Sequence, residues 1–425
     1  MTYKEALLLL EERQETRIDL GLKRLGGHLR RMGDPQDAFP AVIVAGTNGK
    51  GSVCALLAAA LRAAGYRTGL YTSPHLVDPT ERIQVDGVPV SRELFGELLG
   101  AVARAETEPL TFFELFTAAA FEHFRTQAVD IAILEVGLGG RLDAVNCAGK
   151  RVLTVVTAID FDHMDYLGDT LAKIAREKAG IFRSGVPALI GEPKPEPRSA
   201  LEDASREAGA PLSRALEPAP VTEIFWERGI QIIDGFEVSL LGKAQAANVA
   251  VVRAALKLLT ESGFTVGSES ERAGFRQVRW PGRFQVISGP HLPFGHPLPA
   301  PPGEVILDGA HNPQAMRVFC ETFDASPWAK KDVTFVVGFL KDKDYREMIR
   351  ILAPRLKKVI ATAPPSPRAL PAEELATILR QAAPKATISL APLPTSPRKR
   401  GEGIVVCGSF YLVGAYLKEL QKTAA

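Results

Sequence analysis

Short apolar runs of strand length alternate with longer helical patterns along the chain, and this alternation constrains the fold more than any other feature. Four runs in the first part have the length of a buried strand: Ala41–Ala45, Thr68–Tyr71, Asp130–Val136 and Val152–Ile159. Helical patterns follow them: Ser52–Ala64, Phe112–Phe124 and Leu171–Ile181. A β-α-β rhythm whose strands are apolar throughout predicts a parallel sheet covered by helices on both faces.

The rhythm weakens over residues 191–220, which are polar and proline-rich, and residues 224–238 then alternate like a small antiparallel addition. Prolines cluster between Pro290 and Gly303, which we interpret as a linker. Strand candidates resume beyond it: Glu304–Leu307, Val333–Val337, Lys358–Ala361 and Ile404–Cys407. We therefore predict an α/β protein with a large N-terminal domain over residues 1–289 and a smaller, Rossmann-like C-terminal domain over residues 304–425.

Composition narrows the class of protein. A length of 425 residues favours two domains, and a hydrophobic fraction of 46% suits a soluble globular chain. A net charge of +2 gives no reason to expect nucleic acid or an anionic membrane as a partner. The four cysteines are scattered and form no CxxC, so neither a zinc site nor disulfides are expected. The charged N-terminus does not read as a signal peptide, and we expect a cytoplasmic protein with no membrane segment.

A glycine-rich loop follows the first strand. Its sequence is Ala45-Gly46-Thr47-Asn48-Gly49-Lys50-Gly51-Ser52, and a helical pattern begins there. Glycines let backbone N–H groups surround phosphate oxygens, the helix N-terminus favours an anion, and Lys50 adds a cation. The match to the common phosphate-loop pattern is imperfect, because Gly51 stands where Ser or Thr is usual. The strand–loop–helix context nevertheless predicts a nucleotide site in a P-loop-type parallel-sheet domain; the alternative is a glycine turn without a ligand.

Further polar residues follow other predicted strands. Glu135 ends one strand and precedes a glycine-dense turn, so it is placed to bind Mg²⁺ at the carboxyl edge of the sheet, although a helix cap or an ion pair would explain it equally well. His163 follows another strand beside two acids; alone, it reads better as a structural histidine than as a metal ligand. Lys178 lies within a helix, and its pattern alone indicates a solvated surface residue. After the linker, Asp308 ends a strand and His311 lies in the turn that follows; we interpret them as a second site at the edge of the second sheet, with an Asx-type turn as the alternative.

Taken together, these segments resemble the folylpolyglutamate synthase/dihydrofolate synthase family within the Mur ligase superfamily. The matching motifs occur in order along nearly the whole chain: Gly46–Ser52, Thr72–Leu76 with Glu81–Ile83, Glu135–Asp143, Asp162–His163, Glu177–Ile181, Trp280–Arg283, Asp308–Pro313 and Gly408–Leu412. The chain departs from the family pattern at Ile43 and at Ala244-Gln245, where the family commonly has histidine.

The resemblance implies an ATP-dependent ligase that joins L-glutamate to folate or to dihydropteroate. It implies ATP, two Mg²⁺ ions and a monovalent cation as cofactors, and we expect a monomer that binds neither nucleic acid nor a membrane. Nucleotide contacts carry over to Thr47, Asn48, Gly49, Lys50, Gly51, Ser52, Asn248, Arg283, Asp308 and His311. Metal ligands carry over to Ser52, Ser73, Glu135, His163 and a carbamylated Lys178. Catalytic roles carry over to Lys50, His163 and Lys178, and contacts with the folate carry over to Ser73, Pro74, His75 and Arg82.

The implied chemistry passes through an acyl phosphate, because a carboxylate does not react with an amine at neutral pH. The enzyme then positions reactants and offsets charge. Two alternatives stay open at this stage. A peptidoglycan Mur ligase would carry an added N-terminal domain, for which the phosphate loop near residue 46 leaves little room. A non-catalytic ATP switch would be expected to lack Glu135, His163 or Lys178, and all three are present.

Overall fold

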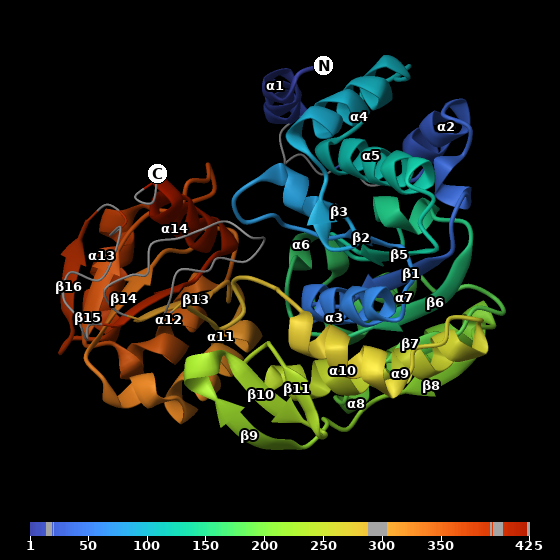
Figure 1. The fold of residues 1–425 in the computed structure, drawn as a ribbon. Helices are drawn as coiled ribbons and strands as arrows, with labels where there is room; N and C mark the ends of the chain where they lie inside the picture. Colours follow the sequence, from blue (N-terminus) through green and yellow to red (C-terminus); the bar gives the residue numbers. More distant parts are fainter. Residues whose placement is uncertain (14–18, 20, 288–303, 392, 394–402, 423–425) are drawn as a thin grey trace. The chain divides into compact units, whose positions relative to one another are not determined.

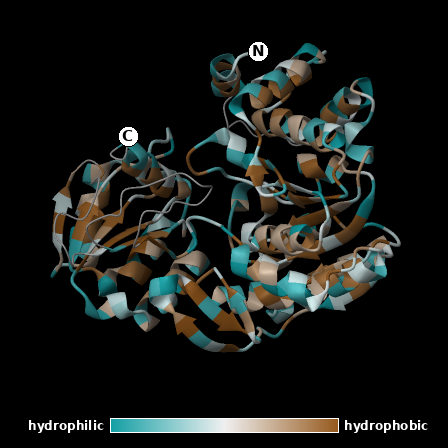
Figure 2. Cartoon of the chain, viewed as in Figure 1, coloured by the Kyte–Doolittle hydropathy of each residue, from teal (hydrophilic) through white to brown (hydrophobic). Residues whose placement is uncertain are grey.

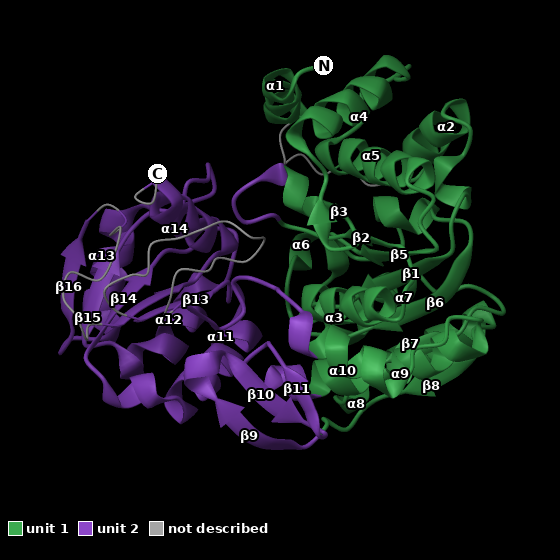
Figure 3. Cartoon of the chain, in the orientation of Figure 1, with its two compact units in different colours: residues 1–74, 80–219, 247–275 green, residues 75–79, 220–246, 276–425 purple. Residues whose placement is uncertain are grey.

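The computed structural model describes residues 1–13, 19, 21–287, 304–391, 393 and 403–422. These residues form two compact units (Figure 3). Unit 1 comprises residues 1–74, 80–219 and 247–275, and unit 2 comprises residues 75–79, 220–246 and 276–425. The chain therefore passes between the units several times rather than once.

Unit 1 is built on an eight-stranded sheet of order β4-β3-β2-β5-β1-β6-β7-β8 (Figure 1). Its strands are β1 (Ala41–Ala45), β2 (Thr68–Tyr71), β3 (Ile83–Val85), β4 (Val88–Pro89), β5 (Ile131–Glu135), β6 (Arg151–Val156), β7 (Ala188–Ile190) and β8 (Leu212–Arg214). From β2 to β8 the neighbouring strands are parallel, and β3 and β4 add an antiparallel edge. All five residues of β1 are fully buried, as expected for a central strand covered on both faces.

The helices of this part of the chain include one at each of the predicted helical patterns 52–64, 112–124 and 171–181. They are α1 (Tyr3–Arg13), α2 (Lys23–Arg31), α3 (Lys50–Ala63), α4 (Arg92–Arg104), α5 (Phe112–Thr126), α6 (Met164–Leu167), α7 (Leu171–Ala179), α8 (Pro195–Ala208), α9 (Ala244–Glu261) and α10 (Ser268–Gln277). The polar stretch 191–220 holds α8 and β8, which its charged and proline-rich sequence concealed. Strand β6 ends at Val156 rather than at Ile159. Ala158 bonds to the glycine-rich loop of residues 46–52, which keeps the name of its prediction, the phosphate loop, and Ile159 bonds to the side chains of Glu192 and Lys194 instead of a neighbouring strand.

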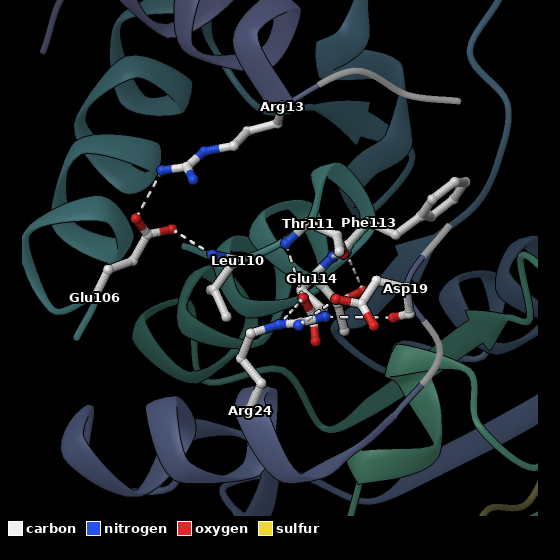
Figure 4. A network of polar contacts seen from close by, with 9 residues as sticks. Arg13, Asp19, Arg24, Glu106, Leu110, Thr111, Phe113 and Glu114 are labelled. Atoms are coloured by element: carbon white, nitrogen blue, oxygen red, sulfur yellow. Dashed lines mark hydrogen bonds and ion pairs between the residues drawn. The ribbon is translucent and has the colours of Figure 1, made fainter. Parts of the chain in front are cut away.

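Ion pairs tie the N-terminal helices to the segment that opens α5 (Figure 4). Arg13 pairs with Glu106 at 2.8 Å, and Arg24 pairs with both Asp19 at 2.6 Å and Glu114 at 2.8 Å. Glu114 also completes a capping box with Thr111 at the start of α5. The side chain of Glu114 is only 5% exposed, so Arg24 neutralises a carboxylate that is almost out of contact with water.

Unit 2 holds a six-stranded sheet of order β12-β13-β17-β14-β15-β16, parallel except for β12, and a three-stranded antiparallel sheet of β9, β10 and β11. The bounds are β9 (Val221–Phe225), β10 (Ile230–Ile233), β11 (Phe236–Val238), β12 (Gln285–Ile287), β13 (Glu304–Asp308), β14 (Val333–Val337), β15 (Lys358–Ala361), β16 (Thr387–Leu390) and β17 (Gly403–Cys407). Its helices are α11 (Pro313–Ala325), α12 (Tyr345–Leu352), α13 (Ala372–Ala382) and α14 (Phe410–Lys422). Hydrophobic residues concentrate in the strands of both large sheets (Figure 2).

The observed units divide the chain differently from the predicted domains. Residues 276–287 belong to unit 2, because β12 pairs with β13. Residues 220–246 also belong to unit 2, where Ile224, Trp226 and Leu241 pack on its core. The predicted linker, 290–303, lies outside the described residues. No helix among the residues described has both the length and the apolar character to cross a membrane.

Candidate functional site

The loops that carry the predicted site residues of unit 1 leave the same edge of its sheet. Strands β2, β5, β1, β6 and β7 are neighbours and run parallel, so their carboxyl ends lie together. In open parallel sheets this is the edge at which ligands bind. The phosphate loop follows β1, Ser73 follows β2, Glu135 closes β5 and His163 follows β6.

The phosphate loop is held by the chain that follows β6. The backbone N–H of Thr47 donates to the carbonyl of Ala158 at 2.7 Å, and the Thr157 hydroxyl donates to the carbonyl of Asn48 at 2.8 Å. Gly46 passes so close to Thr157 that a Cβ there would meet its Oγ1 at 1.9 Å. Lys50 opens α3, and its Nζ donates to the Thr47 carbonyl at 3.1 Å. Thr157 was not among the predicted site residues.

Asn248 of α9 lies directly against this loop. Gly49 has φ +88°, and a Cβ at that position would come within 2.5 Å of the Asn248 Oδ1. Glycine is therefore required here both for the left-handed backbone and for the close approach of the amide. The structure thus brings Asn248 to the phosphate loop from roughly 200 residues further along the chain.

Ser73 and Glu135 meet at the neighbouring strand ends. Glu135 is 4% exposed, and its Oε2 accepts a hydrogen bond from the Ser73 N–H at 3.0 Å. Within the described residues no three His, Cys, Asp or Glu side chains gather into a metal-binding group. A hydroxyl and a carboxylate still fit Mg²⁺, which takes few protein ligands and keeps water or phosphate oxygens in the remaining positions.

Lys178 is not the solvated surface residue that its helical pattern indicated. It is 5% exposed, and its Nζ donates to the carbonyl of Gly46 in the phosphate loop at 2.9 Å. The β5 loop packs tightly on the same helix end, since a Cβ at Gly140 would lie 2.7 Å from the Lys178 carbonyl. The side chain of Lys178 is therefore directed to the loop that follows β1.

His163 caps α6 with φ +51°, and its backbone N–H donates to the Asp162 carboxylate at 2.9 Å. About a third of its side chain, 34%, is exposed, so the imidazole is accessible to a ligand. Its ring Nε2 lies 3.8 Å from the same carboxylate, a distance too long for a hydrogen bond.

Two further groups shape the loops around this edge. Asp143 accepts hydrogen bonds from the N–H groups of Gly137 and Leu138 at 3.0 and 2.8 Å, which folds the glycine-dense turn onto itself. Burial raises the pKa of Asp143.

Arg82 is fully buried, with its guanidinium 5.0 to 5.5 Å from three phenyl rings: Phe112, Phe113 and Phe116. These cation–π contacts give Arg82 a packing role in unit 1, and its contact with substrate stays a prediction.

The other predicted nucleotide residues form a separate group in unit 2. The Asp308 carboxylate accepts from the N–H groups of Phe284 and Ala310, each at 2.8 Å, and burial raises the pKa of Asp308 to about 6. Arg283 lies 4.2 Å from the centre of the Phe410 ring, and His311 lies 5.2 Å from the same ring. Because a carbonyl only accepts, the 2.9 Å contact from the His311 Nδ1 to the Gly309 oxygen places a proton on Nδ1. His75, predicted to contact folate, also lies in unit 2, whereas Ser73 and Pro74 lie in unit 1.

Comparison with known proteins gives consistent relatives over the whole chain. The Mur ligase middle domain matches residues 44–191, and the Mur ligase glutamate ligase domain matches residues 282–409. The dihydrofolate synthase/folylpolyglutamate synthase of Escherichia coli is 36% identical over 413 residues, covering 96% of this chain and 93% of that protein.

Solved structures agree with this. E. coli FolC in complex with DHPP and ADP has a TM-score of 0.84 at 32% identity and covers 100% of this chain and 99% of its own. A bifunctional folylpolyglutamate synthase/dihydrofolate synthase with Mn, AMPPNP and L-glutamate bound has a TM-score of 0.78 at 31% identity, covering 99% and 98% of the two chains.

Proposed function

The chain belongs to the folylpolyglutamate synthase/dihydrofolate synthase family of Mur ligases, and from this premise we propose how its residues perform the family's reaction. It is an ADP-forming ligase that uses ATP to join L-glutamate to a folate. We propose that it accepts dihydropteroate as well, acting as a monomer in the cytoplasm.

The observation that carries the assignment to particular residues is the sheet edge of unit 1. There, the phosphate loop with Lys50 lies between the β5 end, which carries Glu135, and the β6 loop, which leads to His163. Backbone N–H groups and the α3 N-terminus favour the anionic phosphates of ATP, and the Lys50 ammonium offsets charge on the outer phosphates. In unit 2, Arg283, Asp308 and His311 supply a second set of proposed nucleotide contacts.

The proposed reaction has two steps. A carboxylate oxygen of the folate attacks the γ-phosphorus of ATP, ADP leaves, and an acyl phosphate forms. The neutral amine of glutamate then attacks the acyl carbon, inorganic phosphate leaves, and the nitrogen loses one proton. The residues of this chain serve by positioning the reactants and by stabilising developing negative charge.

Two metal positions are proposed. One Mg²⁺ would be held by Ser52, Ser73 and Glu135, and the other by His163 and a carbamylated Lys178. When bound, these ions would neutralise negative charge on the phosphates. A lysine ammonium cannot bind a cation, so Lys178 must first lose a proton and take up CO₂. A monovalent cation is a further proposed ligand.

The experiment that tests the proposal is a substrate panel. Dihydropteroate and tetrahydrofolate are each offered with ATP, Mg²⁺ and L-glutamate, and ADP release is measured together with the glutamylated product. We expect ADP and product in equal amounts, dependent on both the pteroyl substrate and glutamate. The Lys50→Ala variant should lose roughly 100-fold or more in turnover. Nucleotide binding without ADP release under any of these conditions would instead identify an ATP-dependent switch.

A further inference from the structure

A buried acid with no role in the scheme above lies at the same sheet edge. Glu192 follows β7, is fully buried, and uses both carboxylate oxygens on backbone donors. The N–H of Ile159 donates to one oxygen, and the N–H of Lys194 donates to the other at 2.7 Å. Burial raises the pKa of Glu192, because removing a carboxylate from water costs free energy. The two backbone hydrogen bonds offset part of that cost.

The side chain of Lys194 binds the backbone of the same residue, Ile159, at its carbonyl. Its Nζ donates to the Ile159 carbonyl at 2.6 Å and to the Asp160 carboxylate at 2.9 Å. The N–H and the C=O of Ile159 are therefore each bound to the 192–194 loop. A backbone segment fixed at both polar groups has little freedom to change its position.

This segment is in turn bonded to the phosphate loop. The Asp160 N–H donates to the Thr47 Oγ1 at 3.0 Å, and the Thr47 hydroxyl donates back to the Asp160 carbonyl at 3.0 Å. The Thr47 carbonyl accepts from the Nζ of Lys50. Glu192 is thus connected to the phosphate loop by hydrogen bonds at each end of the dipeptide Ile159-Asp160. The path ends at Thr47, whose carbonyl accepts from Lys50.

We propose that Glu192 and Lys194 are positioning residues that set the phosphate loop in its nucleotide-binding geometry through the segment 159–160. The inference rests on the proposed function in taking ATP as the ligand of that loop. Neither side chain touches the nucleotide in this scheme. A role limited to packing the edge of the sheet would alter the stability of the protein without any specific coupling to Thr47.

The test uses the full-length protein, with Mg²⁺-AMPPNP affinity measured by calorimetry and ligase turnover measured beside it. In Glu192→Gln the amide keeps one acceptor but turns an NH₂ group toward a backbone N–H, so one buried donor loses its partner. We expect the Kd for Mg²⁺-AMPPNP to rise roughly tenfold. Lys194→Met leaves the Glu192 carboxylate in place and should also raise the Kd for Mg²⁺-AMPPNP. It replaces Glu192→Gln as the test if Glu192→Gln does not fold. Glu207→Gln, an exposed carboxylate of α8, is the matched control and should change nothing.

A double-mutant cycle with Thr47→Val separates positioning from general stability. Glu192→Gln and Thr47→Val interrupt the same series of hydrogen bonds. The double variant should therefore raise the Kd for AMPPNP by less than the product of the two single effects. For the control pair, Glu207→Gln and Thr47→Val, the combined change in Kd should equal that product. Hydrogen exchange at the 159–160 amides should rise in Glu192→Gln. Unchanged affinity in a folded Glu192→Gln and Lys194→Met, or multiplicative effects with Thr47→Val, would overturn the inference. Failure of the wild-type enzyme to ligate glutamate would instead count against the proposed function, because the binding cycle does not depend on turnover.

Discussion

At the scale of single residues, Lys178 shows how burial changes the meaning of a side chain. A lysine within a helix is normally a solvated surface residue, which is why the pattern alone indicated solvent exposure. The structure instead directs the amine to the carbonyl of Gly46. As an ammonium, Lys178 would help to bind phosphate directly, whereas as a carbamate it would bind a metal ion. Experiments can distinguish these two forms of the side chain.

We predict that Lys178 is carbamylated in the active enzyme. Lys178→Ala should lose roughly 10–100-fold in turnover, as is usual when support for a metal is removed, and a short carboxylic acid should restore part of it by filling the vacated volume. Enzyme equilibrated with ¹³C-bicarbonate should give a carbamate carbon signal that Lys178→Ala lacks. Lys173→Ala, an exposed lysine of the same helix, is the control. Full activity in Lys178→Arg would rule the carbamate out, because guanidinium cannot form it.

The second prediction at this scale concerns Asp308. Its pKa is raised to about 6 in the folded state from 3.8, chiefly by burial, so folding favours the protonated acid. Below about pH 4 the group is protonated in both states, so its contribution to stability is fully present and does not change with pH. Between about pH 4 and 6 the unfolded chain loses the proton first, so this contribution to stability falls as pH rises and stays lost above pH 6.

Asp308→Asn should remove that slope from the denaturation midpoint of unit 2 between pH 4 and 6, although the substitution itself costs a hydrogen-bond acceptor. Asp332→Asn replaces an exposed carboxylate of the same unit and should keep the slope. The opposite result, a midpoint that rises with pH in the wild type but not in Asp308→Asn, would mean that Asp308 is stabilised as the carboxylate.

At the scale of elements, the start of α5 depends on a helix far away in sequence. Removing Arg24 would leave the buried Glu114 charge without its partner, so Arg24→Met should lower the free energy of unfolding by about 3 kcal/mol. Arg125→Met breaks an exposed pair on the same helix and should cost less than about 1 kcal/mol. Chemical denaturation measures both. If Arg24→Met with Glu114→Gln is no more stable than Arg24→Met alone, the charge is not the cause.

Helix α14 packs on the short segment 75–79. A Cβ at Gly414 would meet the Leu76 carbonyl at 1.9 Å, and this backbone atom cannot rotate away as a side chain can. Gly414→Ala should therefore displace the segment and raise its hydrogen exchange, with a loss of about 1–3 kcal/mol in unit 2. Gly26→Ala is a matched helical control with open space around it, and should stabilise by about 0.5–1 kcal/mol. Unaltered exchange at residues 76–77 in Gly414→Ala would contradict the contact.

Local patterns in the sequence predicted what depends on local physics. Apolar runs predicted β1 and β5 in unit 1 and β13, β14, β15 and β17 in unit 2, and the glycine spacing predicted the loop before α3. Long-range contacts escaped the pattern. Glu192 reads as one acid in a polar stretch, and nothing nearby in sequence indicates that it bonds to Ile159. Asn248 entered only through the family resemblance, because its partner Gly49 lies across the fold.

At the scale of the whole molecule, unit 1 is completed only by residues 247–275. Val249, Val252, Leu259 and Phe275 of that stretch are fully buried. At about 2 kcal/mol for each such side chain, their loss approaches the entire stability of a typical domain. We therefore predict that a fragment of residues 1–219 is unfolded, whereas residues 1–289 give a cooperative melt. Circular dichroism on both fragments decides this, and a cooperatively folded 1–219 fragment would refute it.

The packing of Leu76 on α14 has a consequence for the nascent chain during synthesis on the ribosome. The segment 75–79 leaves the ribosome early, but Gly414 follows roughly 340 residues later. At about 5–20 residues per second, that interval is on the order of tens of seconds. During it the segment has no native surface to occupy, and its apolar side chains remain available to chaperones. The segment 75–79 can therefore reach its native packing only after α14 has been synthesised.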